Sequence, residues 1–290
     1  MIAIIINEFL KLTVKSSGAE MVSIKNTITS KEYLWQGDPA FWARRAPILF
    51  PIVGKVHENT YTIDGQKYEL PQHGFARDMH FELVDHVENS LTYVLKSNVE
   101  TLKIYPYKFE LYVRYSLEDN KVLVNYEVKN CDEQTIWFSL GAHPAFNCPL
   151  EANEKFSDYY LEFEKEETVS TKLLDNGLRN GKEMPMLKNQ KTIPLQKDLF
   201  DNDALIFDDL RSSAISLKSY KSKHSIKMDF AGFPYLGIWS KKGGSPFVCI
   251  EPWLGIADTV GYQGEFKDKM GMRSLSKGKS FVAGYSLEIG

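Results

Sequence analysis

The sequence predicts an all-β protein, and three observations support this fold class. Apolar and polar residues alternate with a period of two in several runs, which places one face of each run in a core. Such runs recur along the chain, with turn-forming residues between them. Helical signals are few, because no segment keeps apolar residues at i, i+3, i+4 and i+7 over three turns. We therefore predict a large antiparallel sandwich or barrel.

Two hairpins can be placed from the residues. Residues 60–63 and 66–70 flank Asp64-Gly65, a dipeptide that tolerates the positive φ of a type I′ turn. Residues 109–118 and 121–129 both alternate, and the polar residues between them supply turn chemistry. Shorter alternating or β-branched runs predict further strands at 81–84, 91–95, 136–140, 226–230, 247–250 and 281–289.

The chain is predicted to form one domain over residues 1–290. At about 150 residues per domain, its 290 residues would suggest two domains, but all-β folds of about 200 to 250 residues often form one. The polar stretch 153–197, rich in Glu and Lys, is similar to a linker in composition. A strand-like segment at 159–163 lies inside it, however, and no second composition class follows. We therefore expect a single domain with an elaborated middle.

Composition and charge exclude several classes of protein. The 25% of charged and 43% of hydrophobic residues are typical of a soluble globular chain. Lys and Arg number 35 against 38 Asp and Glu, and the two signs are interspersed, so no basic footprint for nucleic acid exists. The longest apolar stretches, 1–6 and 46–53, fall far short of the ~20 residues that cross a bilayer. We expect neither a nucleic-acid nor a membrane partner.

The cysteines and the first residues favour a cytoplasmic location. Cys131, Cys148 and Cys249 are odd in number and widely spaced, and no CxxC pair suggests zinc or redox chemistry. The first residues lack a basic segment ahead of the apolar run and lack a small-residue cleavage site. Secretion is therefore not predicted.

Three polar side chains stand where strands are expected to give way to loops. His73 lies with Arg77 in a loop of small and apolar residues, and His143 follows a strand in a loop with Gly and Pro. Glu251 ends an apolar strand beside a tryptophan, where partial burial would raise its pKa. Two histidines and a carboxylate at such junctions of one β domain suit paired acid and base catalysis.

Each of these residues also has a plainer interpretation. A histidine in a Gly/Pro loop more often binds a backbone group, and the glutamate could pair with Arg44, Arg45 or Arg77. The two histidines and the carboxylate could also ligate zinc, but no His-x-His or HExxH spacing supports that set. We therefore predict no metal, and we weigh the three residues together.

Aromatic residues near these positions favour a carbohydrate ligand. Flat apolar rings suit the C–H faces of a sugar, while polar side chains bind its hydroxyls. The chain contains no GxSxG, GxxxxGK[ST] or GxGxxG motif, so serine hydrolysis and nucleotide cofactors are not predicted. The aromatic residues that flank the three polar side chains are Phe75, Phe146, Trp239 and Trp253.

Three motifs, QHGFAR at 72–77, GAHPAFN at 141–147 and IEPWLGIAD at 250–258, resemble the aldose 1-epimerase (galactose mutarotase-like) family, closest to its LacX-like branch. Leu34-Trp35 and the segments 46–54 and 271–278 extend the resemblance over nearly the whole chain. It implies a single large antiparallel β-supersandwich without metal or organic cofactor. The implied activity is interconversion of the α and β anomers of a hexose.

The resemblance also implies roles for individual residues. His143 is expected as the general acid, Glu251 as the general base, and His73 as a hydrogen-bonding partner near the ring oxygen and the anomeric hydroxyl. Asp201 competes with Asp203 for the sugar-binding position, and Arg44 competes with Arg45. The expected substrate-binding residues are Arg44, Arg45, Arg77, Asp203 and Trp239.

Three alternatives stay open at this point. The chain could be a non-catalytic carbohydrate-binding or sugar-sensing protein, or a mutarotase for a hexose 6-phosphate. It could also hydrolyse glycosides, with Asp203 as the second carboxylate beside Glu251. The branch that it resembles and the net charge of −3 favour a neutral aldohexose as the small-molecule partner. A homodimer is left open.

Overall fold

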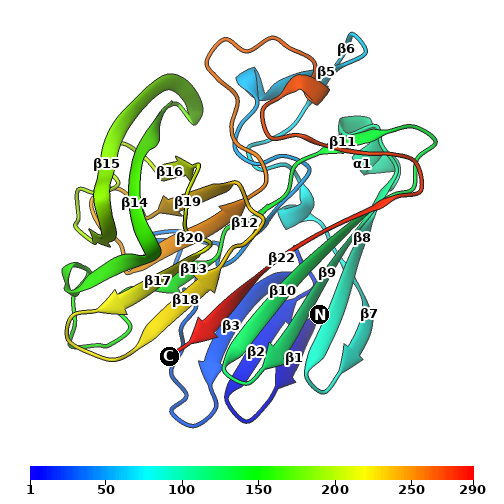
Figure 1. The fold of residues 1–290 in the computed structure, drawn as a ribbon. Coiled ribbons are helices and arrows are strands. Elements are labelled where there is room, and N and C mark those ends of the chain that lie inside the picture. The colour runs from blue at the N-terminus through cyan, green and yellow to red at the C-terminus, as the bar shows by residue number, and fades with distance from the viewer.

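The computed structural model describes residues 1–290 and shows a chain built almost entirely of strands (Figure 1). The α-helix α1 (Val99–Ile104) is short and begins at Asn98, whose side chain accepts hydrogen bonds from the N–H groups of Glu100 and Thr101. The fold class is all-β, as predicted. The remaining helical turns are 3-10 helices at His57–Asn59, Ala76–Asp78, Phe156–Asp158 and Phe266–Asp268.

Nine strands form the largest sheet, in the order β15-β14-β17-β18-β22-β10-β9-β8-β7, and every pairing in it is antiparallel. The last strand of the chain, β22, pairs with both β10 and β18 and so joins segments far apart in sequence. The nine strands are β7 (Glu82–Val87), β8 (Ser90–Lys96), β9 (Phe109–Glu118), β10 (Lys121–Asn130), β14 (Tyr159–Asp175), β15 (Leu178–Pro194), β17 (Ala214–Ser219), β18 (Ser225–Asp229) and β22 (Ser280–Ile289).

A second sheet of six strands carries the candidate site. Its order is β16-β19-β20-β12-β4, and β13 also pairs with β20. β20 is the middle strand of this order, and all seven of its residues are buried. The strands are β4 (Ile48–Leu49), β12 (Gly141–Ala142), β13 (Ala145–Asn147), β16 (Leu205–Asp208), β19 (Tyr235–Trp239) and β20 (Phe247–Trp253).

Three small sheets complete the molecule. One contains β1, β2 and β3, another pairs β5 with β6, and the third pairs β11 with β21. These strands are β1 (Ile2–Ile6), β2 (Leu10–Lys15), β3 (Glu20–Asn26), β5 (Thr60–Ile63), β6 (Gln66–Glu69), β11 (Ile136–Phe138) and β21 (Arg273–Leu275).

Both predicted hairpins are present. In β9 and β10, Glu118 lies opposite Lys121, and the burial of β9 alternates along its whole length. In β5 and β6, Asp64 and Gly65 both have positive φ, as a type I′ turn requires. Local residue chemistry therefore determines these two turns.

The middle of the chain is more regular than the sequence suggested. The segment predicted as one short strand at 159–163 is the start of β14, which with β15 forms a hairpin of two 17-residue strands. Register shifts interrupt this pairing, and much of β15 is exposed, so the hydrophobic alternation that signals a strand is lost. Asn176 and Gly177 form its tight turn with positive φ.

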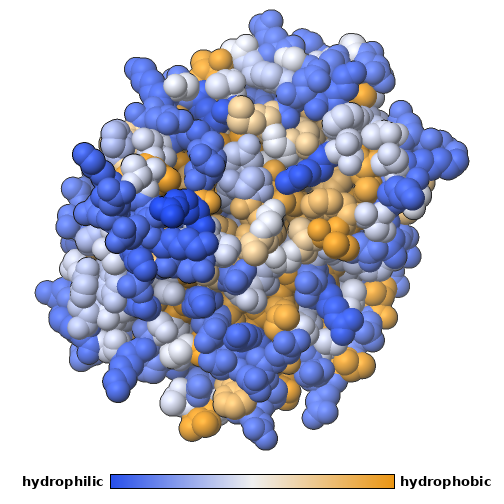
Figure 2. Space-filling model, in the orientation of Figure 1, coloured by the Kyte–Doolittle hydropathy of each residue, from blue (hydrophilic) through white to orange (hydrophobic).

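One hydrophobic cluster connects the layers. Its 66 buried residues run from Ala3 near the N-terminus to Ile289 near the C-terminus and include side chains of both large sheets. A contiguous core of this extent supports our proposal that residues 1–290 form one domain. Polar side chains cover most of the face shown in Figure 2, with apolar ones gathered towards its middle. None of the helices has the length and apolar character that crossing a membrane requires.

Candidate active site

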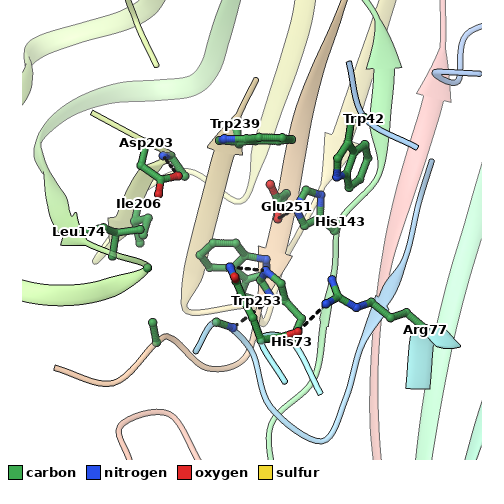
Figure 3. Close-up of a pocket in the computed structure, with 15 residues that line it drawn as sticks. Trp42, His73, Arg77, His143, Leu174, Asp203, Ile206, Trp239, Glu251 and Trp253 are labelled. Carbon is green, nitrogen blue, oxygen red and sulfur yellow. Dashed lines mark hydrogen bonds and ion pairs between the residues drawn. The ribbon is translucent and has the colours of Figure 1, made fainter. Parts of the chain in front are cut away.

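Ends of strands in the six-stranded sheet and several loops enclose a cavity of about 330 Å³ (Figure 3). Trp42 and Trp239 lie on one side of the central polar pair in this view, and Trp253 lies on the other. Six of the eight residues predicted for the site line the cavity. They are His73, Arg77, His143, Asp203, Trp239 and Glu251.

The pairing of β12 with β20 explains how His143 and Glu251 meet. Gly141 of β12 lies opposite Trp253 of β20, and Ala145 of β13 lies opposite Cys249 of the same strand. Residue 143 lies midway between 141 and 145, and residue 251 lies midway between 249 and 253. The antiparallel register therefore places His143 opposite Glu251 although 108 positions separate them (251 − 143). Imidazole Nε2 and carboxylate Oε2 lie 3.2 Å apart.

Burial shifts both members of this pair towards their neutral forms. Glu251 is 1% exposed, and burial raises its pKa well above the ordinary value; the Trp253 indole opposes this shift and the charge of Asp203 adds to it. Burial also lowers the pKa of His143 to about 3. The pair thus retains one exchangeable proton over a wide pH range, and burial favours its location on the carboxyl group.

The two ring nitrogens of His73 have different hydrogen-bonding roles. The backbone N–H of Gly54 donates to His73 Nδ1 at 3.1 Å, so the proton of the neutral ring resides on Nε2, which lies 3.3 Å from the side-chain amide of Gln72. Burial lowers the pKa of His73 well below its ordinary value, and neighbouring His143 adds to the effect. His73 itself has a φ of 68°, and a Cβ on the following Gly74 would come within 2.2 Å of the Phe50 carbonyl oxygen. The loop thus requires glycine at position 74.

Indole rings form much of the cavity wall. Trp42 stacks on the His143 ring at a centroid distance of 4.8 Å, and Trp239 meets both rings edge to face. Trp253 crosses Gly237 of β19, where a Cβ would lie 2.5 Å from the indole. Trp42 was not among the residues predicted for the site, and its only signal in the sequence is its position two residues before Arg44. These rings exclude water from the polar pair and expose flat apolar faces to the cavity.

The arginines separate into three environments. Arg77 lines the cavity and donates to the backbone oxygen of Gln72 at 2.6 Å, while its buried Nε has no hydrogen-bond partner. Arg44 lies outside the lining and pairs with Asp78 at 2.9 Å. Arg45 lies in a different hollow, over the sheet of β1, β2 and β3, so the structure does not bring it to the site.

The structure distinguishes the two candidate aspartates. Asp203 lines the cavity on the side away from Arg77 (Figure 3). Its backbone has a positive φ of 77°. Asp201 is exposed and does not line the cavity; its backbone oxygen accepts a hydrogen bond from Lys242. Apolar side chains stand beside Asp203, namely Leu174 of β14 and Ile206 of β16. Neither of them was among the residues predicted for the site.

The metal-binding alternative takes a different form in the structure. The group whose donor atoms lie within 4.8 Å of one another is His143, Cys249 and Glu251, and His73 is not part of it. The set of two histidines and one carboxylate, which was disfavoured from the sequence, is therefore not the group whose donor atoms meet.

Known proteins resemble this chain in sequence and in overall structure. The family model for aldose 1-epimerase matches residues 1–269. The plasmid-encoded protein LacX of Lactococcus lactis subsp. lactis is 39% identical over 276 residues, 91% of each chain.

Two solved structures resemble the whole chain. A galactose mutarotase related enzyme from Lactobacillus acidophilus has a TM-score of 0.96 and 38% identity, covering 100% of this chain and 97% of the other. A galactose mutarotase-like protein from Lactobacillus casei has a TM-score of 0.94 and 35% identity, covering all of both chains. The protein therefore belongs to the aldose 1-epimerase family of sugar isomerases, in its LacX-like branch.

Proposed function

We propose that this protein interconverts the α and β anomers of a neutral aldohexose, with His143 and Glu251 as the proton-exchanging pair. The observation that carries this proposal is the 3.2 Å approach of imidazole Nε2 and carboxylate Oε2 at a cavity wall of aromatic rings. Both groups are buried, and burial favours the neutral form of each.

The reaction explains why two such groups must be neighbours. Opening of a cyclic hemiacetal removes the proton from the hydroxyl on C1 and adds a proton to the ring oxygen. Both oxygens are bonded to C1, so the base and the acid must lie side by side. The aldehyde then rotates about C1–C2, and the ring closes on its other face while the two groups exchange roles. Neither a covalent intermediate nor a cofactor is needed.

The protonation state fits this cycle. In the ion-pair form, the Glu251 carboxylate accepts the hydroxyl proton and the His143 imidazolium donates to the ring oxygen. This form has the same proton count as the neutral form that burial favours, so conversion between the two needs only transfer across 3.2 Å. Sugar hydroxyls supply hydrogen bonds that stabilise the ion pair when the cavity is filled.

The remaining lining residues favour a neutral sugar over a phosphorylated one. One arginine, Arg77, faces the cavity, and the carboxylate of Asp203 stands on the opposite side. A phosphate site needs converging cations, and the negative charge of Asp203 would repel the substrate. Arg44 is already paired with Asp78. We therefore propose glucose or galactose as the substrate class rather than a hexose 6-phosphate.

Polarimetry and NMR on freshly dissolved α-glucose and α-galactose test this function. A mutarotase accelerates exchange between anomers above the rate in buffer, and the proposed pair makes this acceleration depend on both His143 and Glu251. A sugar-binding protein would broaden the sugar resonances without faster exchange. A glycosidase would release methanol from methyl galactoside. Either of these last two results would overturn the proposal.

A further inference from the structure

We infer that His143, Cys249 and Glu251 form a binding site for a thiophilic divalent cation of the zinc class, and that such a cation blocks the proton-exchanging pair. The site would be inhibitory, since it occupies groups that the reaction uses. It differs from the two-histidine set considered from the sequence, because a thiol replaces His73.

Strand geometry brings the three donors together. Cys249 and Glu251 are two positions apart on β20, so their side chains point to the same face of the sheet. His143 reaches this face from the adjoining segment between β12 and β13. The three ligand atoms lie within 4.8 Å of one another, and the nitrogen and the oxygen are 3.2 Å apart. Tetrahedral zinc holds such donors about 3.3–3.7 Å apart, so modest side-chain adjustment suffices.

One ligand atom of the group makes no hydrogen bond within the protein. Oε2 of Glu251 is buried and lacks one, although His143 Nε2 lies 3.2 Å away and Glu251 is only 1% exposed. An unpartnered carboxylate oxygen in this environment is costly unless a ligand binds it. The thiol of Cys249 is likewise buried, among the aromatic rings of Trp35 and Phe247.

The chemistry of the donor set selects the class of cation. Binding displaces one proton from the thiol and one from the carboxyl group, and both pass to solvent, so two anionic donors neutralise the doubly charged ion. Neutral His143 supplies a lone pair, and a fourth position opens towards the cavity for water. One thiolate, one imidazole and one carboxylate suit zinc or cadmium, whereas magnesium and calcium require a shell of oxygen ligands. Because protons are released, affinity should rise with pH.

Cobalt(II) provides a spectroscopic test that does not depend on sugar turnover. For this experiment the parent and every variant also carry Cys131→Ser, because this substitution removes the exposed thiol. Titration with Co²⁺ should then produce a thiolate-to-cobalt charge-transfer band that equimolar Zn²⁺ abolishes. Cys249→Ser should lose the band, whereas Cys148→Ser should keep it. Cys148 is the matched control because it is equally buried and lies outside the donor group.

Inhibition provides a second measurement on the same variants. Zn²⁺ should suppress anomer exchange in the parent, EDTA should restore it, and Mg²⁺ should have no effect. With each variant normalised to its own metal-free rate, Cys249→Ser should need at least about tenfold more Zn²⁺ for half inhibition. Circular dichroism establishes that this variant is folded, and Cys249→Ala serves as the second substitution.

A charge-transfer band that persists in folded Cys249→Ser would overturn the site, because another thiol would then bind the ion. Equal zinc sensitivity in Cys249→Ser and the parent would do the same. The absence of sugar turnover in every variant would refute the proposed function alone, since the cobalt band would still decide the metal site.

Discussion

Glu251 and Asp258 stand at the two ends of the segment 251–258, and each belongs to a buried acid–base pair. The two pairs differ in what their polar atoms contact. His143 and Glu251 face the cavity, and each retains a polar atom without a hydrogen-bond partner. Lys269 and Asp258 approach at 3.4 Å and are almost completely buried. Lys269 also donates to the backbone oxygen of Ile256.

The second pair is committed to the protein backbone. Asp258 Oδ2 accepts from the N–H of His57, its own N–H donates to the Lys55 carbonyl, and its carbonyl accepts from the N–H of Arg179. These contacts connect the loop that follows Gly54, the segment that follows β20, and the hairpin of β14 and β15, and each of these regions contributes residues to the cavity wall. Burial alone therefore does not mark a catalytic group. What distinguishes the first pair is that its hydrogen-bonding capacity is left for a ligand.

The largest effect should come from removing proton exchange without changing shape. His143→Asn and Glu251→Gln should each lower kcat by about 10²- to 10⁴-fold, because each removes one partner of the proton transfer. The free energy of unfolding should change little or increase, since a buried ionisable group is replaced by a neutral one. Anomer exchange followed by NMR and urea unfolding measure the two quantities. Unchanged turnover in both variants would refute the roles.

The second pair should show the reverse pattern. Lys269→Met leaves the Asp258 carboxylate buried without its cation and should lower the free energy of unfolding by about 3–5 kcal/mol. Addition of Asp258→Asn should recover part of that loss, because the unpaired charge is removed. In the folded fraction, kcat should fall less than in Glu251→Gln. A Lys269→Met variant of full stability and greatly reduced kcat would contradict the comparison.

The pH dependence should reveal the neutral character of the first pair. If neither pKa were shifted, kcat would fall at acidic pH because Glu251 becomes protonated. Burial reverses the order of the two pKa values, so the acidic limb belongs to His143 and the basic limb to Glu251. Below about pH 3, His143 becomes protonated and the pair holds two protons; above the raised pKa of Glu251, the pair loses its one exchangeable proton. kcat should therefore stay level from mildly acidic to neutral pH. NMR titration of the imidazole checks this, and a midpoint near 6.5 for His143 would contradict it.

The two pKa shifts also predict how the free energy of unfolding changes with pH. His143 has a lowered pKa, so the unfolded chain binds more protons between about pH 6.5 and 3, and stability falls as pH falls through that window. Glu251 has a raised pKa, so its contribution falls as pH rises above about 4.5. Comparing His143→Asn with the parent across pH 3 to 7 isolates the first contribution. A constant difference in unfolding free energy would argue against a neutral histidine.

The smallest effect concerns substrate charge. KM for glucose or galactose should be insensitive to salt, because a neutral ligand gains no screened attraction. Asp203→Asn should raise KM for these sugars by losing a hydroxyl acceptor, and should weaken rejection of glucose 6-phosphate. A preference of the parent for glucose 6-phosphate that falls with salt and disappears in Arg77→Ala would replace the proposed substrate while leaving the chemistry intact.

The sequence by itself determined the features that depend on neighbouring residues. Alternation along 109–118 predicted a strand with one buried face, and Asp64-Gly65 predicted a turn with positive φ. The strand-to-loop positions of His73, His143 and Glu251 marked them as candidates, because polar groups at the ends of apolar strands need a local reason.

Only the tertiary structure decided which of these residues meet. Strand order and register place His143 opposite Glu251 across 108 positions, and the same packing directs Arg45 into another hollow and brings Asp203 rather than Asp201 to the cavity. The cavity wall from β14 and β16 left no signal in the sequence, because bulges break the alternation of β14. Contacts between distant segments depend on which strands pair and in what register, and a periodic pattern specifies the face of a strand but not its partner.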